Sequence, residues 1–300
     1  MGTAKNAERG YWCAASGAAV WGLSGVAGQF LLSQYNVSPY WLTSVRMICA
    51  GMVFFLLTVR NLKAVGTIVR HPKELGTIAV YGIFGLMLNQ LAYFFSISYS
   101  NAGTATVLQT LCVVMLAVVV CITRKRLPYG REVLSVLLAL LGVVLIATHG
   151  KITELVLSEK ALGWGLLDAA SCVVYTMLSL KPVRKWGSVP VNALGMLTGG
   201  MFLAVIFRFW EHMPHLDVTA WLVFAGIVLF GTVLTYMLFL QGIRDAGPLN
   251  ATLLATIEPV SSSVCSAVLL GTVFTVPEWI GLICIVATVF LIVAQRRVTG

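Results

Sequence analysis

Residues 105–110 read Ala-Thr-Val-Leu-Gln-Thr, and residues 251–256, which lie 146 positions later, read Ala-Thr-Leu-Leu-Ala-Thr. The same register continues without a gap and places Glu132 over Glu278, each at the start of the apolar segment that follows. Threonines and a glutamate that recur at matched positions favour an internal duplication over chance similarity between apolar segments. The sequence therefore predicts that the chain is built from two related halves.

The composition around this repeat is that of a membrane protein. Hydrophobic residues make up 59% of the 300 residues and charged residues only 10%, whereas about a quarter of the residues of a soluble domain are charged. Apolar stretches of roughly 20 residues, the length that a helix needs to cross a bilayer, recur along the whole chain. We predict ten transmembrane helices, at residues 10–32, 38–59, 77–98, 102–123, 132–149, 161–180, 190–210, 219–243, 248–271 and 277–295.

The basic residues predict how these helices are oriented. Of the 20 Lys and Arg residues, only Lys151, Lys160 and Arg208 fall in connectors on one side, Arg46 lies within a span, and the other sixteen flank the opposite ends of the spans. Because flanking Lys and Arg are retained in the cytoplasm, we expect a multi-pass protein of the cytoplasmic membrane with both termini cytoplasmic.

The repeat and the span count together predict an inverted duplication. Each half, residues 1–150 and residues 151–300, contains five predicted spans, so the second half enters the membrane in the opposite orientation. We therefore expect an all-α membrane protein in which two inverted-topology five-helix repeats form one integrated transmembrane domain. Secondary transporters typically have this architecture, with a central site between the halves.

Four short motifs, in this order along the chain, resemble the EamA-type branch of the drug/metabolite transporter superfamily. They are Val20-Trp21-Gly22, Ser44-Val45-Arg46-Met47, Ala92-Tyr93-Phe94-Phe95 and Ile257-Glu258-Pro259-Val260. The resemblance, which is also to aromatic-amino-acid exporters, implies a ten-helix bundle that exports amino acids, related metabolites or drugs by alternating access. Two departures leave the substrate class open: Ser171-Cys172-Val173 stands where the family often has Ser-Trp-Ala, and Val113 stands where it often has a proline.

Three ionisable residues lie within the spans, where a charged side chain costs about 2.5–3.5 kcal/mol on insertion scales. The first, Arg46, is about eight residues into its span, or about 12 Å deep at the rise of a helix. It either holds a carboxylate of the substrate or of the protein, or anchors the fold through backbone carbonyls. A guanidinium is always charged and does not itself carry a coupling proton.

The second ionisable residue, Glu258, directly precedes Pro259 near the middle of the ninth span. Because proline cannot donate to the carbonyl four residues back, we expect a kink there, with Pro259 as a hinge. Glu258 either takes up and releases a proton during a transport cycle, or forms a structural pair with Arg46 or a hydrogen bond that fixes the kink.

The third ionisable residue, Asp168, begins a polar stripe on the sixth span. Asp168, Ser171, Cys172 and Tyr175 follow the i, i+3, i+4, i+7 spacing and share one helix face. Asp168 either binds a cationic amine or a proton, or lies near the outer rim and is simply hydrated.

Other side chains are candidates for the walls of a binding pocket, because aromatic faces and neutral amides can grip a small substrate. These candidates are Trp21, Tyr93, Trp164, Tyr175, Asn89, Gln90 and Gln109. Aromatic residues near span ends are instead typical of the membrane interface; we assign Tyr11, Trp12, Tyr40, Trp41, Trp221 and Trp279 to that belt. In the seventh span, Gly195 and Gly199 predict close helix packing.

The repeat and the acids within the spans predict a secondary transporter, and the family resemblance implies that it exports small organic metabolites such as amino acids, amines or drugs. Proton exchange or the gradient of the substrate itself would drive it, since the chain lacks GxxxxGK[ST] and HExxH motifs. An uptake carrier of the same fold stays open. A membrane-embedded enzyme, with Asp168 and Glu258 as acid and base, is disfavoured because no nucleophile or metal-ligand set accompanies them. We expect no cofactor, no metal and no nucleic acid, but a small-molecule substrate, a lipid bilayer and a monomer or weak homodimer.

Overall fold

The computed structural model describes residues 2–58, 62–123, 125, 127–149, 156–246, 251 and 254–299. The predicted boundary between the halves, at 150/151, and the predicted start of the ninth span, at residue 248, lie outside these residues. So do four of the basic residues used to predict the orientation, namely Arg60, Arg124, Arg126 and Lys151.

Helices form all the regular secondary structure of the described residues. In the first half they are α1 (Gly2–Gln34), α2 (Pro39–Leu57), α3 (Leu62–Arg70), α4 (Pro72–Val80), the π-helical segment η2 (Tyr81–Met87), α5 (Leu88–Tyr99), α6 (Ala102–Thr110), α7 (Cys112–Thr123) and α8 (Gly130–Thr148). In the second half they are α9 (Glu159–Trp186), α10 (Ser188–Phe207), the 3₁₀ segment η3 (Phe209–His212), α11 (Val218–Val228), the π-helical segment η4 (Leu229–Leu234), α12 (Thr235–Ala246), α14 (Ile257–Leu270) and α15 (Val276–Thr299).

Eight helical stretches of the described residues are long and apolar enough to cross a bilayer. They comprise Glu8–Gln34, Pro39–Leu57, Pro72–Tyr99, Ala102–Thr123, Gly130–Thr148, Glu159–Trp186, Ser188–Phe207 and Val218–Ile243. Two further apolar helices, Ile257–Leu270 and Val276–Leu291, are shorter within the described part of the chain. An all-helical, multi-pass membrane fold is thus confirmed, while the count of ten spans stays a prediction.

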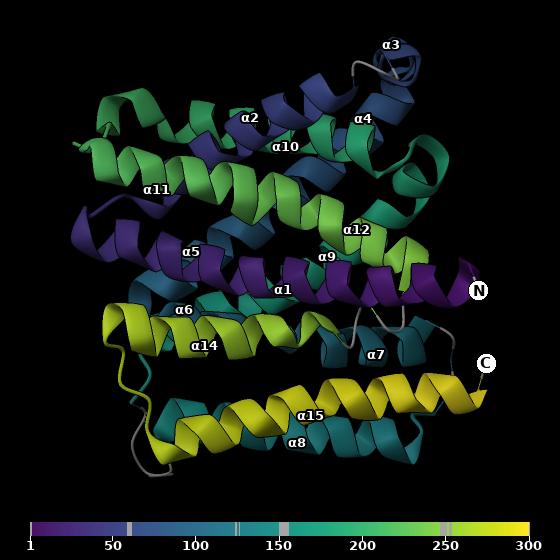
Figure 1. Ribbon diagram of the computed structural model, residues 1–300, viewed down its shortest axis with the longest axis vertical. Helices are drawn as coiled ribbons and strands as arrows, with labels where there is room; N and C mark the ends of the chain where they lie inside the picture. Colours follow the sequence, from purple (N-terminus) through teal and green to yellow (C-terminus); the bar gives the residue numbers. More distant parts are fainter. Residues whose placement is uncertain are drawn as a thin grey trace.

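The helices pair across the two halves in a regular way. Helix α2 packs along α10 and α8 along α15, and each of these pairs joins a helix to the one about 146 residues later; α6 packs along α14, which is the counterpart of α7. Helix α1 packs along α12, and its counterpart in the other half, α9, packs along α5. Figure 1 shows α8 beside α15 and α1 beside α12, with both chain ends on the same side of the bundle. Exchanging the two halves therefore maps the α2–α10 and α8–α15 contacts onto themselves and the α1–α12 contact onto the α5–α9 contact.

The interruptions of the helices also occur at matched positions. The π-helical segments η2 (Tyr81–Met87) and η4 (Leu229–Leu234) lie 147–148 residues apart and interrupt the third stretch of each half. The stretch of α6 and α7 is interrupted at Leu111, and the corresponding segment of the second half is interrupted at Thr256, where α14 begins. A π-helical turn leaves the regular hydrogen-bond ladder and is frequent at functional sites.

The matched glutamates of the repeat have the same structural role. The backbone N–H of Tyr129 donates to Glu132 Oε2 at 2.8 Å, and the backbone N–H of Thr275 donates to Glu278 Oε2 at 2.7 Å. Each glutamate is the third residue of its helix and satisfies a backbone donor that the helix leaves unpaired. The recurrence of Glu132 at Glu278 in the sequence thus reflects a shared helix cap.

Removal of one such cap tests its contribution to stability. We expect Glu278→Ala to lower the free energy of unfolding in detergent by about 1 kcal/mol, the usual contribution of a helix cap. Denaturant unfolding of the purified protein measures this difference. Glu211→Ala, at a half-exposed position of η3 where the acid pairs with Arg208, serves as the control and should change stability little. An equal effect of both substitutions would contradict the capping role.

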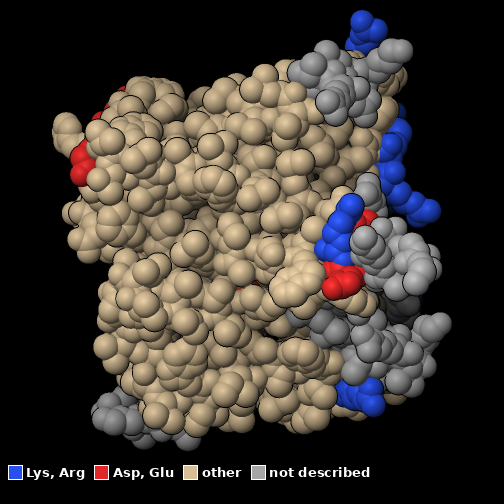
Figure 2. All heavy atoms as spheres, in the orientation of Figure 1, with Lys and Arg blue, Asp and Glu red and all other residues tan. Residues whose placement is uncertain are grey.

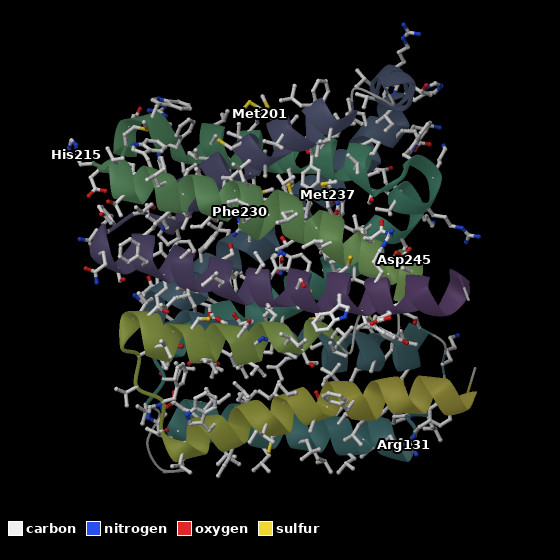
Figure 3. The ribbon with its side chains drawn as sticks, viewed as in Figure 1. Arg131, Met201, His215, Phe230, Met237 and Asp245 are labelled. Atoms are coloured by element: carbon white, nitrogen blue, oxygen red, sulfur yellow. The ribbon has the colours of Figure 1, made fainter. Side chains whose placement is uncertain are left out.

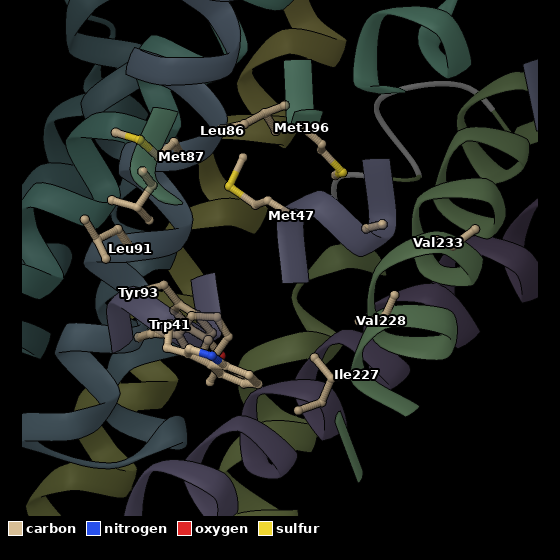
Figure 4. Close-up of a cluster of buried hydrophobic side chains, with 14 of the residues drawn as sticks. Trp41, Met47, Leu86, Met87, Leu91, Tyr93, Met196, Ile227, Val228 and Val233 are labelled. Atoms are coloured by element: carbon tan, nitrogen blue, oxygen red, sulfur yellow. The ribbon is translucent and has the colours of Figure 1, made fainter. Parts of the chain in front are cut away.

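The core contains one residue that the sequence places wrongly. Trp41 is only 1% exposed; its Nε1–H points to Met213 Sδ at 3.4 Å and its ring packs on Trp221 and Phe224. The prediction that Trp41 belongs to the interfacial belt is therefore wrong, because α11 and the segment before it cover this end of α2. Figure 4 shows Trp41 in a buried cluster with Met47.

The outer surface is the apolar surface of a membrane protein. Leu222, Phe230 and Val268 are each more than half exposed. Figure 2 shows a face almost free of charge, with Lys and Arg gathered at the edge where Figure 1 places the two termini. Figure 3 places Arg131 and Asp245 at this terminal end of the bundle and His215 at the opposite end.

Candidate functional site

Asp168 of α9 is held between two helices of the first half. Its side chain is fully buried. The amide Nδ2 of Asn89 in α5 donates to Oδ1 at 2.6 Å, and the amide Nε2 of Gln109 in α6 donates to the same oxygen at 3.3 Å. The second oxygen, Oδ2, is buried and has no hydrogen-bond partner among the described residues. The alternative that Asp168 lies hydrated at the outer rim is therefore wrong, because α5 and α6 cover it.

Arg46 of α2 is buried against the second half. Only 7% of the surface of Arg46 is exposed. Its Nε–H donates to Thr232 Oγ1 in η4 at 2.9 Å. The guanidinium carbon lies 5.3 Å from the centre of the Phe94 ring, in range of a cation–π contact. Among the described residues, no acceptor is bonded to its two terminal nitrogens, so this end of the fork is available to an anion.

Glu258 lies deep among the helices but is only half-buried. Its charge interacts with that of Arg46, yet no described carboxylate comes within the 4.0 Å of the guanidinium that defines an ion pair. Glu258 is the second residue of α14, where the unpaired N–H groups of a helix start favour negative charge. The alternative of a tight structural pair between Glu258 and Arg46 does not describe this arrangement.

Pro259 marks the interruption of the ninth predicted span. We expected a kink inside a continuous helix; instead the chain turns at Thr256, α14 begins at Ile257, and Pro259 lies buried in its first turn. Proline is tolerated there because the N–H that it lacks has no partner within the helix. The position of Pro259 therefore places Glu258 at a helix start.

Aromatic side chains surround these polar groups. Trp21 of α1 packs edge-on against Tyr236 of α12, with ring centres 5.2 Å apart. Tyr175 of α9 stacks on Tyr81 of η2 at 5.8 Å. Trp164, another predicted pocket residue, instead stacks on Phe95 near the start of α9. Sequence reasoning missed Tyr81 and Tyr236, since nothing in the periodicity marks which tyrosines of a span face its partners.

Two further predicted residues have structural surroundings. The Tyr93 hydroxyl lies 2.9 Å from Thr106 Oγ1, and the side chain is 9% exposed. Gln90 is also buried, and its Oε1 has no hydrogen-bond partner among the described residues. Tyr93 therefore joins α5 to α6, while Gln90 offers an unused acceptor.

Matched positions of the two halves contribute a cross-half hydrogen bond each. Arg46 in α2 bonds Thr232 in η4, and Asn192, which is 146 residues after Arg46, accepts a hydrogen bond from the Tyr81 hydroxyl in η2 at 2.7 Å. Each π-helical segment is thus tied to the second helix of the other half. The sequence repeat, applied to Arg46, would have identified Asn192 as a partner site.

The sequence pattern of the EamA-like transporter family matches residues 8–148 and again residues 159–294. The chain belongs to the EamA-like transporter family. Two relatives have names that describe them as uncharacterized: the inner membrane transporter YicL of Salmonella typhimurium, 32% identical over 93% of both chains, and a transporter of Clostridium kluyveri, 22% identical over 87% of this chain and 85% of its own. A solved crystal structure covers 94% of this chain and 99% of its own at 17% identity and a TM-score of 0.61, and so shows the same fold.

These comparisons confirm the predicted family, the duplication of its domain and the assignment as a multi-pass membrane transporter. The names of these relatives do not confirm the similarity to aromatic-amino-acid exporters. These names give no substrate, direction or coupling either.

Contacts tie the helices of this EamA-like transporter together at both ends of the bundle. At the terminal end, Arg9 pairs with Asp245 at 3.1 Å, which joins α1 to α12. At the opposite end, the Tyr35 hydroxyl donates to Asp217 Oδ1 at 2.9 Å, which joins the end of α1 to the start of α11. The backbone N–H of Ala220 and the Tyr35 hydroxyl hold the pKa of Asp217 below its ordinary value. The polar groups in the middle of the bundle thus lie between two linked ends.

Proposed function

We propose that this EamA-like transporter is a secondary exporter of small organic metabolites, such as amino acids, amines or drugs, and that Glu258 carries the coupling proton. One observation carries the proposal: a half-buried carboxyl group lies deep in the bundle, near a buried guanidinium but outside ion-pair distance. Glu258 can therefore be charged or protonated without breaking a direct bond. Export as the direction rests on the family resemblance; uptake by the same fold is the alternative.

Alternating access requires two arrangements of the helices, and the matched elements of the two halves supply a route to them. We infer that the halves have opposite orientation in the membrane, with both termini cytoplasmic. The exchange of helix pairs between halves, the paired π-helical segments and the interruptions at Leu111 and Thr256 support this inference. Discontinuous helices around a central site are typical of secondary transporters.

In this proposal the central side chains have different roles. Arg46 holds an anionic group of the substrate, since its terminal nitrogens are not engaged by described residues and a guanidinium fits a carboxylate in a bidentate manner. Trp21 and Tyr175 contribute half-buried aromatic faces. Asn89 and Gln109 position Asp168, and Pro259 ends the first turn of the helix that carries Glu258.

The experiment that tests the proposal combines a substrate screen with one substitution. A thermal-shift screen of the purified protein against metabolites identifies a ligand, because binding to the folded form raises its apparent stability. Reconstituted vesicles then measure transport of this ligand with and without a pH gradient. We expect the wild type to respond to the gradient and Glu258→Gln, an isosteric group that cannot exchange a proton, to lose proton-driven transport while remaining folded.

Glu211→Gln is the matched control, since it makes the same acid-to-amide change in η3, at a half-exposed position away from the centre. It should transport like the wild type. Full activity of Glu258→Gln with an unaltered response to pH would show that this carboxyl group is structural. Accumulation of substrate against its gradient only in the inward direction would favour uptake over export.

A further inference from the structure

We propose that the free oxygen of Asp168 is the binding position for a protonated amine, and that the transported molecule is an organic ammonium which exchanges with a proton at this carboxyl group. The inference rests on the proposed function and names its substrate class. It concerns Asp168, whereas the proposed proton coupling concerns Glu258.

The carboxyl group of Asp168 is held through one of its two oxygens. Two amides, from Asn89 and Gln109, both donate to Oδ1 and so fix the plane of the group, while Oδ2 is left without a partner. Asn89 also reaches the backbone carbonyl of Asp168 at 3.3 Å. The amides come from two helices of the first half and the acid from the second half, so the oxygen is held in position at the junction of the halves.

Burial makes the ionised form of Asp168 costly. An ionised carboxylate with no exposed surface costs several kcal/mol unless a cation or a proton neutralises it. No Lys, Arg or His side chain of the described residues lies within 4.0 Å of Asp168. Since no described side chain neutralises Asp168 directly, we assign this role to a proton when the site is empty of substrate and to a cationic group when it is loaded.

The acidic and basic groups in the middle of the bundle are unequal in number. The described part of this region holds one guanidinium, Arg46, and two carboxyl groups, Asp168 and Glu258, whose charges interact. With both acids ionised the cluster is one positive charge short. A substrate with an ammonium group supplies that charge.

An aromatic side chain lies on the same helix face as Asp168. Tyr175 lies seven residues after Asp168 on the same face of α9, about 10 Å along the helix axis, and is half-buried. Its ring stacks on that of Tyr81. Such faces accommodate the flat or apolar body of an amine. The titratable groups near this part of α9 are Tyr93, Tyr81 and Cys112 on elements packed against it, Cys172 and Tyr175 on α9 itself, and Glu258 on α14 and Tyr236 on α12.

The exchange is balanced in atoms and charge. When the ammonium arrives, the O–H bond of the Asp168 carboxylic acid breaks and its proton passes to water. An N–H of the ammonium then donates to the freed carboxylate oxygen. One proton leaves for each ammonium bound, and the reverse occurs when the amine departs.

The test measures protons released on binding. Phenethylammonium is titrated into the purified protein by calorimetry in buffers of different ionisation enthalpy, with the neutral isostere 2-phenylethanol as the comparison. At acidic pH we expect about one proton released per ammonium bound, and an apparent affinity that falls about tenfold for each unit by which the pH is lowered, as linkage of one proton requires. The alcohol should bind far more weakly and release none.

Two variants locate the effect. Asp168→Asn should lose both the ammonium binding and the proton release, and Glu211→Gln should retain both. If Asp168→Asn does not fold, the proton count of the wild type and its preference for ammonium over alcohol still decide the matter. Equal binding of the alcohol, binding without proton release at acidic pH, or no binding of phenethylammonium by the wild type would each overturn the proposal.

The test is separable from that of the proposed function. A wild type that carries out proton-driven transport of an uncharged or anionic metabolite, and does not bind phenethylammonium, would overturn the substrate class alone. Ammonium binding linked to Asp168 in a protein whose transport does not depend on Glu258 would leave the present inference standing and remove the proposed coupling residue.

Discussion

Gly199→Leu is expected to leave little folded protein. In α10 a Cβ at Gly199 would overlap the backbone carbonyl of Gly82 in η2 and lie 2.9 Å from Met47 Cε in α2. The backbone atom cannot move without displacing η2, so the cost should reach about 3 kcal/mol or more, the upper part of the range for overpacked cores. Size-exclusion profiles and thermal unfolding of the detergent-purified variant measure the loss.

Gly226→Leu is the matched control. It makes the same substitution in α11, where a Cβ would meet no atom within 4 Å. We expect this variant to fold like the wild type, because a leucine is as apolar as the lipid tails around a span. Equal stability of the two variants would show that α10 and η2 do not approach each other as closely as the structure has them.

This contact illustrates what the sequence does predict. Gly195 and Gly199, spaced four residues apart in an apolar segment, predict a close helix approach, and the structure places both against η2. Glu132 and Glu278 recur at one register and have the same capping role. These features depend on residues that lie near one another in the chain, so their spacing in the sequence is enough to predict them.

Features that depend on distant residues were not predictable in the same way. The hydropathy of residues 72–99 and 218–243 is that of ordinary spans, and it does not register the π-helical segments η2 and η4 within them. The partners of Asp168 lie 79 and 59 residues away. Asn89, Gln109 and Asp168 were each predicted as pocket residues, but only the packing of α9 against α5 and α6 decides between a buried acid and a hydrated one.

The second large effect is expected at Arg46. We expect Arg46→Met to abolish transport and to lower the free energy of unfolding at neutral pH by about 1.5–3 kcal/mol, the usual contribution of a hydrogen bond made by a charged group, because it removes the Nε–H bond to Thr232 and the positive charge near Glu258. The loss should shrink at acidic pH, where a protonated Glu258 needs no counter-charge. Denaturant unfolding at several pH values, together with transport in vesicles, measures both effects.

Two further variants separate charge from hydrogen bonding at this site. Thr232→Val removes only the acceptor of the Arg46 Nε–H, so its effect should depend little on pH. Glu258→Gln combined with Arg46→Met should recover part of the stability that Arg46→Met loses, with a coupling of about 1–3 kcal/mol as expected for neighbouring groups. Additive effects would show that the two charges do not act on one another. Protonation of Glu258 could then not respond to Arg46 or to the anionic group that Arg46 holds.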